Sequence, residues 1–269
     1  MLFACCVENS SIQLGVLDGD RVAVDARVAA RADRSADEYE VIFAGILALH
    51  GIDPARIDAA VLSSVVRPLT ATVGAAIARR FGVKPLVVGP GVKTGLDIRT
   101  DVATQVGADL VANAVGALTI ASPPVLVLDF GTATTLAGID VHGLFTGVAI
   151  APGVRTSLDA LSAKAAELPR IGLEPPRSLF GRNTIDAMAS GTVYGHAALA
   201  DGLVARAREE WGADAPSQTT LLATGEWAES IVPHCDPRNG IRLVPELSLL
   251  GLKRIHDLNA RPRTREGPA

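Results

Sequence analysis

The feature that most constrains the fold of this chain is an apolar stretch that ends in one carboxylate and a turn. Residues 125–136 read VLVLDFGTATTL, and four strand-forming apolar residues lead to Asp129. A short apolar run that is bounded by glycine and small hydroxyl residues is typical of a buried strand that ends at a turn. The sequence therefore predicts that a buried strand carries Asp129 to the end of a sheet.

This strand and turn favour a nucleotide-binding fold. After Asp129, Gly131 and Thr132 offer a tight turn with backbone amides and hydroxyl groups. Actin-like phosphotransferases use such a turn to bring amides and a cation-binding oxygen to a nucleotide, so the pattern indicates ATP chemistry. The alternative interpretation is an ordinary tight turn with no ligand.

Length and composition favour a soluble α/β protein of two domains. A chain of 269 residues suits two cores of ordinary size. Hydrophobic residues make up 48% of the chain and aromatic residues only 4%, which favours a packed α/β protein over disorder. A net charge of −4 argues against a nucleic-acid surface. No segment approaches the roughly 20 apolar residues that a membrane-spanning helix needs, so no membrane partner is expected.

The three cysteines, Cys5, Cys6 and Cys235, predict a reducing compartment. Their spacing matches neither a disulfide framework nor a zinc site. Reduced thiols are the normal state in the cytoplasm, which is therefore the expected location.

Strands and helices alternate in two successive halves. In the first half, a hairpin of residues 2–7 and 12–17 precedes a helix that Ser35 and Glu38 cap and Gly51 ends. Strands at 59–66 and 85–88 and helices at 69–81 and 106–118 follow. In the second half, a strand at 125–129 is expected to form a hairpin with one at 145–150, before a helix at 185–211, a strand at 221–224 and a helix at 248–258. We expect two tandem actin-like (ribonuclease H-like) domains with mixed sheets, residues 1–120 and 121–258, with a cleft between them and a basic disordered tail at 259–269.

Several ordered motifs over nearly the whole chain resemble the type III pantothenate kinase family. They are SADEY (35–39), SSVV (63–66), GPGVKTGLDIR (89–99), VGAD (106–109), DFGTATT (129–135), IAPGV (150–154), GRNTIDAMASG (181–191) and the closing LSLLGL. The resemblance implies transfer of the γ-phosphoryl group of ATP to the primary hydroxyl of pantothenate, the first step toward coenzyme A.

The resemblance also implies roles for single residues. Asp109 corresponds to the proton acceptor, a role that suits a positioned carboxylate beside an attacking alcohol. Asp129 corresponds to the ligand of a monovalent cation, K⁺ or NH₄⁺, and Thr132 to an ATP contact. Thr184 corresponds to a pantothenate contact that reaches the neighbouring subunit of a homodimer. From the residues alone, Asp109 is equally a carboxylate favoured by a helix N-terminus, and Thr184 is equally a helix cap.

The rest of the implied site lies in two segments. The ATP phosphates and Mg²⁺ are expected at the opening hairpin, and pantothenate is expected around the VGAD motif. The hairpin residues are Cys6, Val7, Glu8, Asn9, Ser10, Ser11, Ile12 and Gln13, and the substrate residues are Thr100, Gly107, Ala108, Asp109, Leu110 and Thr184.

Four positions depart from the family pattern. Cys6 replaces the aspartate that organises magnesium, and Glu8 replaces a glycine that lets the backbone approach the phosphates. Leu110 replaces an arginine suited to the substrate carboxylate, and Thr100 replaces an aromatic residue. These changes predict weak ATP binding and reduced discrimination against an uncharged acceptor such as pantetheine.

The carboxylate of Glu8 is the most costly of these departures. A carboxylate about 5 Å from one phosphate charge costs about 3 kcal/mol at an effective dielectric constant of about 20. Residues 6 and 8 leave the same face of an extended strand, so one hypothesis is that Glu8 holds magnesium in place of the missing aspartate. Glu226 follows Gly225 in the second half, where it is either a nucleotide neighbour or an ordinary surface residue.

Three functions therefore compete at this point. The first is a divergent pantothenate kinase, and the second is a family member that has lost activity and serves as a ligand-binding or regulatory protein. The third is another actin-like kinase that acts on a sugar or a short acid, which fits DFGTATT but not VGAD and GRNTIDAM.

Overall fold

The computed structural model describes residues 1–212 and 219–260. The chain forms two compact units, and each is discontinuous in sequence. The first unit contains residues 1–95, 107–116 and the C-terminal segment from residue 249, and the second contains residues 96–106 and 117–248. The expected domain limits, 1–120 and 121–258, stay a prediction, and residues 261–269 of the expected tail lie outside the described residues.

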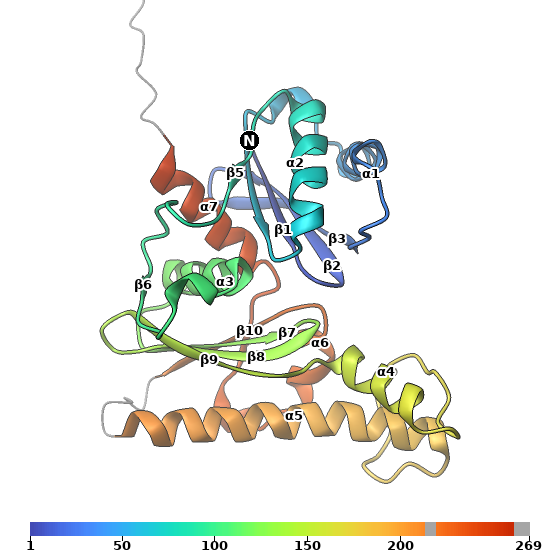
Figure 1. The fold of residues 1–269 in the computed structure, drawn as a ribbon. Coiled ribbons are helices and arrows are strands. Elements are labelled where there is room, and N and C mark those ends of the chain that lie inside the picture. The colour runs from blue at the N-terminus through green and yellow to red at the C-terminus, as the bar shows by residue number, and fades with distance from the viewer. Residues whose placement is uncertain (213–218, 261–269) are drawn as a thin grey trace, which may run out of the picture. The chain divides into compact units, whose positions relative to one another are not determined.

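The first unit is built on a five-stranded mixed sheet. Its strands are β1 (Leu2–Val7), β2 (Ser11–Asp18), β3 (Arg21–Ala29), β4 (Ala59–Ser64) and β5 (Leu86–Val87), in the spatial order β3-β2-β1-β4-β5 (Figure 1). β1 is antiparallel to β2 and parallel to β4. The predicted hairpin and both later strands are confirmed. Sequence reasoning missed β3, an edge strand with only one buried residue, Val24.

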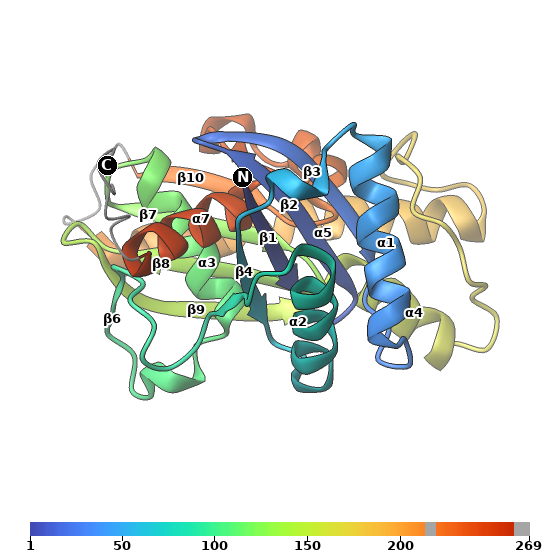
Figure 2. The ribbon, with the colours of Figure 1, turned by 90° about the horizontal axis from the view of Figure 1, so that it is seen from above.

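Two helices cover one face of this sheet. They are α1 (Ala36–Leu49) and α2 (Arg67–Phe81), which lie side by side over the strands in both ribbon views (Figures 1 and 2). The predicted capping box is present, because Ser35 Oγ accepts from the Glu38 amide at 3.3 Å and Glu38 Oε2 accepts from the Ser35 amide at 2.8 Å. Gly82 ends α2 in the left-handed conformation, which glycine adopts without steric cost.

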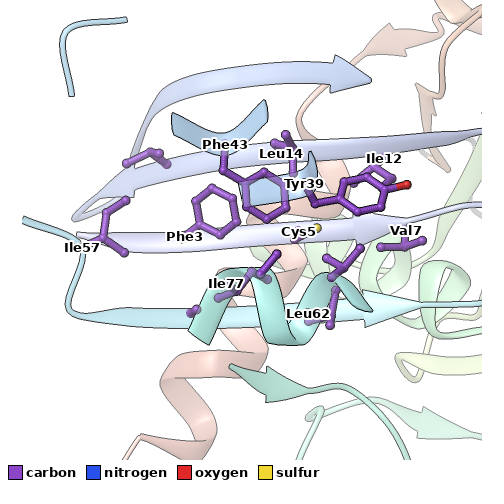
Figure 3. Packing of buried hydrophobic residues seen from close by; sticks show 14 of the residues in the cluster. Phe3, Cys5, Val7, Ile12, Leu14, Tyr39, Phe43, Ile57, Leu62 and Ile77 are labelled. Atoms are coloured by element: carbon purple, nitrogen blue, oxygen red, sulfur yellow. The ribbon is translucent and has the colours of Figure 1, made fainter. Parts of the chain in front are cut away.

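The core of the first unit lies between this sheet face and the two helices. Figure 3 shows Phe3 and Cys5 of β1 and Leu14 of β2 facing Tyr39 and Phe43 of α1. The rings of Phe3 and Phe43 are 5.3 Å apart, a distance suited to a favourable tilted pair. Since successive strand residues point to opposite faces, the residues between these core positions face the other side of the sheet.

The second unit is built on a six-stranded mixed sheet. Its order is β11-β10-β7-β8-β9-β6, formed by β6 (Asp97–Ile98), β7 (Val125–Phe130), β8 (Ala133–Ile139), β9 (Leu144–Pro152), β10 (Thr220–Thr224) and β11 (Arg242–Leu243). The predicted pairing of strands 125–129 and 145–150 is wrong. β7 pairs with β8, and β9 pairs with the other edge of β8. A two-residue connection after Phe130 makes the shorter hairpin possible.

The remaining helices complete the two units. They are α3 (Ala108–Ile120), α4 (Val154–Lys164), α5 (Thr184–Trp211), α6 (Ala228–Ile231) and α7 (Leu247–Asn259), with single 3₁₀ turns at Pro54–Arg56, Ala103–Gln105, Val232–His234 and Pro237–Asn239. α5 runs along the second sheet with α4 beside its N-terminal part (Figure 1). In the first unit, α3 and α7 meet where Gly251 lies against the backbone of Ala112. Among the described residues, no helix has the length and apolarity to cross a bilayer.

Candidate active site

A row of four polar or sulfur-bearing side chains crosses the sheet of the first unit. Gln13 lies directly opposite Cys6 on β1 and opposite Arg27 on β3, and Cys6 lies opposite Ser63 on β4. Residues that are directly opposite point to the same face of a sheet. Because Phe3, Cys5 and Val7 face the helices and the core, this row faces the other side of the sheet. It lies at the end of β1, where the predicted phosphate loop begins.

Cys6 provides no negative charge to this row. Its side chain is fully buried, and burial is the largest cause of a thiol pKa well above its ordinary value. The carboxylates of Glu8 and Asp109 raise the pKa of the Cys6 thiol further. Residue 6 is therefore a neutral thiol near neutral pH, and a neutral thiol is a poor ligand for a hard cation such as Mg²⁺.

Asp109 lies in the first turn of α3 and belongs to the first unit. Its Oδ1 accepts a hydrogen bond from the Leu110 amide at 2.8 Å, and burial is the main cause that raises its pKa above the usual range. Residues 107–110 and the opening hairpin belong to the same unit, and the Asp109 carboxylate is one of the charges that raise the pKa of the Cys6 thiol. A partly buried carboxyl of raised pKa suits a general base.

Gly107 holds the position of this carboxylate. A Cβ atom at residue 107 would lie 2.3 Å from Asp109 Oδ1 and 3.6 Å from Val65 Cγ1. We expect Gly107→Ala to displace the Asp109 side chain and to lower kcat about 100-fold, the scale of a lost general base. The melting temperature should change little, because the displaced atom is the end of a side chain and not the backbone.

The measurements are kcat and the melting temperature of Gly107→Ala, compared with those of the control variant Gly89→Ala. A Cβ atom at Gly89 would meet no atom within 4 Å, so this control should leave both quantities unchanged. Full activity of Gly107→Ala would show that the position of the carboxylate is not critical.

The hairpin turn between β1 and β2 folds back on itself. The Glu8 amide donates to the Ser11 carbonyl at 2.9 Å, and Ser11 Oγ donates to Glu8 Oε2 at 3.0 Å. Asn9 and Ser10 are exposed at the tip of the turn. The side chains of Val7 and Ile12 belong to the core (Figure 3), so these two residues could contact a nucleotide only through their backbone.

In the second unit, two glycines pack against the turn that follows Asp129. A Cβ atom at Gly225, which has a φ of +97°, would lie 2.3 Å from Asp129 Oδ1 and 2.6 Å from the Phe130 amide nitrogen. A Cβ atom at Gly153 would lie 2.3 Å from the Gly131 carbonyl oxygen and 2.4 Å from that of Thr132. The motifs TGE and APGV thus enclose the DFGT turn, whereas Glu226 is exposed beside it.

The surroundings of Asp129 supply oxygen atoms that suit a monovalent cation. Thr135 on β8 and Thr224 on β10 lie directly opposite Asp129, so the three side chains point to one face. Thr135 Oγ1 is buried and makes no hydrogen bond within the described part of the chain. A buried hydroxyl oxygen beside a carboxylate fits a hard cation that prefers oxygen ligands.

Thr184 and Thr100 both lie in the second unit, apart from the Gly107–Leu110 segment, which lies in the first. Thr184 is exposed and is the first residue of α5. The possibility that it caps this helix is wrong, because Asn183 is the cap and accepts from the Asp186 amide at 2.8 Å. Thr184 lines an apolar cavity of about 710 Å³ between α4 and α5, together with Leu161 and Met188.

Sequence reasoning missed three contributors to these sites: Arg27, Ser63 and Thr135. Ser63 and Thr135 lie within the SSVV and DFGTATT motifs but received no role from the sequence, and Arg27 lies outside every motif. The cross-strand register brings out their positions. The alternation of Asp25 and Arg27 in a segment of otherwise apolar residues was the one local signal for β3.

Comparisons with known proteins identify the family of this chain. Residues 4–206 match the family described as type III pantothenate kinase. A type III pantothenate kinase of Exiguobacterium sibiricum is 40% identical over 260 residues, which cover 96% of this chain and 100% of that protein.

Two solved structures show the fold at much lower sequence identity. A putative 2-dehydro-3-deoxygalactonokinase from Sinorhizobium meliloti superimposes with a TM-score of 0.61 at 16% identity and full coverage of both chains. An archaeal actin homologue superimposes with a TM-score of 0.50 at 14% identity, over 96% of this chain and 99% of the other. The chain has the actin-like fold and belongs to the type III pantothenate kinase family.

Proposed function

We propose that the protein transfers the γ-phosphoryl group of ATP to the primary hydroxyl of pantothenate, forming 4′-phosphopantothenate for coenzyme A synthesis. One observation carries the proposal: the partly buried carboxylate of Asp109 lies in the same unit as the opening hairpin and raises the pKa of the Cys6 thiol there. This supports a proton acceptor near the segment that corresponds to the phosphate loop of the family. In the second unit, Asp129 and the DFGT turn would supply the cation-binding carboxylate and the ATP contact that the family resemblance implies.

In this reaction Asp109 accepts the proton of the attacking hydroxyl as the bond to phosphorus forms. The exposed loop residues Asn9 and Ser10 would bind the phosphates through their amides and side chains, and Thr132 would contact ATP. The Oδ1 atom of Asp109 is already oriented by the Leu110 amide. Oriented groups of this kind reduce the reorganisation that the reaction requires.

The two ions have unequal support from the residues present. The carboxylate of Asp129 with the hydroxyls of Thr135 and Thr224 fits K⁺ or NH₄⁺, which would offset negative charge near the nucleotide. The hairpin does not fit a protein-bound Mg²⁺, because Cys6 is a neutral thiol and Glu8 Oε2 already interacts with Ser11 and Arg27. Magnesium would then enter as a complex with the ATP phosphates.

The acceptor is proposed to be pantothenate or a close relative. Leu110 is half-buried and offers no charge to a substrate carboxylate, while Thr100 gives no stacking surface. Each lost interaction weakens the preference for the charged acceptor by about 1–3 kcal/mol. Pantetheine should therefore compete better here than in members that keep the arginine and the aromatic residue.

The deciding experiment measures ATP consumption with pantothenate and with pantetheine, at high magnesium and potassium, against Asp109→Asn. Turnover that depends on an acceptor and disappears in the variant supports the proposal. Equal signal in the variant means that the protein does not catalyse the transfer. In that case, binding of ATP or pantothenate without turnover would favour the alternative, a family member that binds ligands without catalysis. The neutral thiol of Cys6, which cannot hold magnesium as an aspartate does, is the observation that favours this alternative.

We also propose a homodimer in which Thr184 contacts the acceptor bound by the other subunit. The exposed large apolar side chains of the second unit include Ile150, Leu161, Leu179, Phe180 and Ile185, with relative exposures of 45% to 84%. Leu161 and Thr184 also line the cavity between α4 and α5. Exposed apolar side chains that gather into a patch are typical of a protein interface.

Phe180→Asp should therefore convert the dimer to a monomer at micromolar concentrations. Phe180 has 84% of its surface exposed, and a charge placed in an apolar interface costs several kcal/mol when it is buried without a partner. Sedimentation velocity over a concentration series gives the answer, with Val41→Asp on α1 as the control because Val41 is also largely exposed, at 72%. A wild-type protein that sediments as a monomer would contradict the proposal.

A further inference from the structure

Arg27 lies beside the phosphate loop although no motif of the family accounts for it. Its Nη1 atom is 3.6 Å from Glu8 Oε2. The side chain of Arg27 is 25% exposed and that of Glu8 is 12% exposed. Ser11 Oγ donates to the same oxygen at 3.0 Å. The carboxylate of Glu8 is thus drawn toward β2 and β3, the strands that carry Ser11 and Arg27.

The position of Arg27 follows from the sheet. It lies opposite Gln13, which in turn lies opposite Cys6, so it points to the same face as the site. Arg27 Nη1 is buried, and its 3.6 Å separation from Glu8 exceeds hydrogen-bond distance. Within the residues that the structure describes, this nitrogen makes no hydrogen bond. A partly buried guanidinium with an unused donor suits an anion better than a metal ion.

We propose, on the basis of the function proposed above, that Arg27 is a positioning residue of the phosphate loop. Its ion pair keeps the Glu8 carboxylate turned toward the sheet and offsets its charge, so that the loop accepts ATP although it lacks the family glycine. Without a compensating cation, a carboxylate about 5 Å from a phosphate charge lowers ATP affinity about 100-fold at an effective dielectric constant of about 20. The Glu8 carboxylate and the Arg27 guanidinium therefore act together.

This inference conflicts with the hypothesis that Glu8 holds magnesium. A carboxylate that serves the Mg²⁺ ion should be needed for magnesium-dependent ATP binding. A carboxylate that is neutralised by Arg27 should be dispensable, and its removal should help once Arg27 is absent.

The experiment is a double-mutant cycle on ATP affinity in the full-length protein, measured by calorimetry with and without magnesium. Arg27→Met should weaken ATP binding about 30- to 100-fold, following the Coulomb argument. Glu8→Gln should bind ATP within about threefold of the wild type, with unchanged magnesium dependence. The double variant Arg27→Met/Glu8→Gln should recover most of the ATP affinity that Arg27→Met loses. KM for ATP should follow these changes, while kcat changes less.

Two variants serve as controls for charge and folding. Arg21→Met removes an exposed arginine from the same strand and should leave ATP affinity unchanged. Arg27→Lys keeps the charge and should bind ATP within about threefold of the wild type, since a point charge satisfies the electrostatic requirement. Thermal unfolding of every variant identifies any that fails to fold. If Arg27→Met does not fold, ATP binding by Arg27→Lys and Glu8→Gln decides whether Glu8 is a magnesium ligand or a carboxylate that Arg27 neutralises.

The outcomes distinguish a failure of the proposed kinase function from a failure of the role proposed for Arg27. Wild-type protein that binds no ATP removes the proposed function and this inference together. Wild-type binding that is unaffected by Arg27→Met, or that is not recovered by Glu8→Gln in the Arg27→Met background, removes only this inference. Loss of magnesium-dependent binding in Glu8→Gln would identify Glu8 as a metal ligand and would also overturn it.

Discussion

Replacing Asp109 by Asn should stop turnover and at the same time make the fold more stable. Asparagine keeps the oxygen that accepts from the Leu110 amide but cannot take a proton from the attacking alcohol. Loss of a general base typically lowers the rate by about 10²- to 10⁴-fold, so kcat should fall by at least about 100-fold while KM for ATP changes little.

The stability gain follows from the raised pKa of Asp109, which burial causes. The folded state binds the proton of this carboxyl more tightly than the unfolded chain does. The resulting stabilisation is complete below the unfolded pKa and is lost as the pH rises through the folded pKa. Above the folded pKa the wild type therefore carries a partly buried charge that destabilises it, and Asp109→Asn should melt a few degrees higher there.

Two pH profiles test this pair of effects. The wild-type kcat should fall on acidification at a higher pH than an ordinary aspartate would give, because the protonated side chain cannot act as a base. The difference in melting temperature between the wild type and Asp109→Asn should shrink as the pH falls below the folded pKa.

Asp37 provides the control for the stability effect, since it lies in the first turn of α1 but is 78% exposed. Asp37→Asn should leave kcat unchanged and slightly lower the melting temperature, because an exposed carboxylate at a helix N-terminus is favourable. A variant at Asp109 that is both inactive and less stable would contradict the idea of a destabilising buried charge.

Gly225→Ala should produce the largest loss of stability of the changes considered. The added methyl group would overlap the backbone of Phe130 and the Asp129 carboxylate, and the φ of +97° is unfavourable for alanine. Overlap with the backbone cannot be relieved by a side-chain rotation, so we expect a loss of about 3 kcal/mol or more. The activation by potassium that we propose should weaken as well, because Asp129 moves.

The measurement is urea unfolding together with potassium dependence of the rate, with Gly240→Ala for comparison. Gly240 also has a positive φ, of +63°, but a Cβ atom there would meet nothing within 4 Å. Its replacement should cost only the conformational penalty of about 1–2 kcal/mol. Equal losses in the two variants would mean that the contact between Gly225 and the DFGT turn is unimportant.

The local elements of this protein were predictable because they depend on neighbours in sequence. The capping box of Ser35 and Glu38, the end of α2 at Gly82 and the buried strand that leads to Asp129 all follow from patterns within a few residues. The family and the fold class followed from ordered motifs. The edge strand β3 was missed because half-exposed edge strands lack a continuous apolar run.

The sequence by itself determined most of the helices and strands, the family and the candidate carboxylates, whereas only the tertiary structure decided which residues share a site. Cys6, Arg27 and Ser63 lie on one face of the first sheet through strand order and register, and the Asp109 carboxylate of α3 acts on the Cys6 thiol there. The sequence motifs indicate that the hairpin has Cys6 in place of the family aspartate and Glu8 in place of the family glycine. The fold adds that an arginine 19 positions after Glu8 lies 3.6 Å from that new carboxylate, because side chains far apart in sequence are brought together by the pairing of three strands.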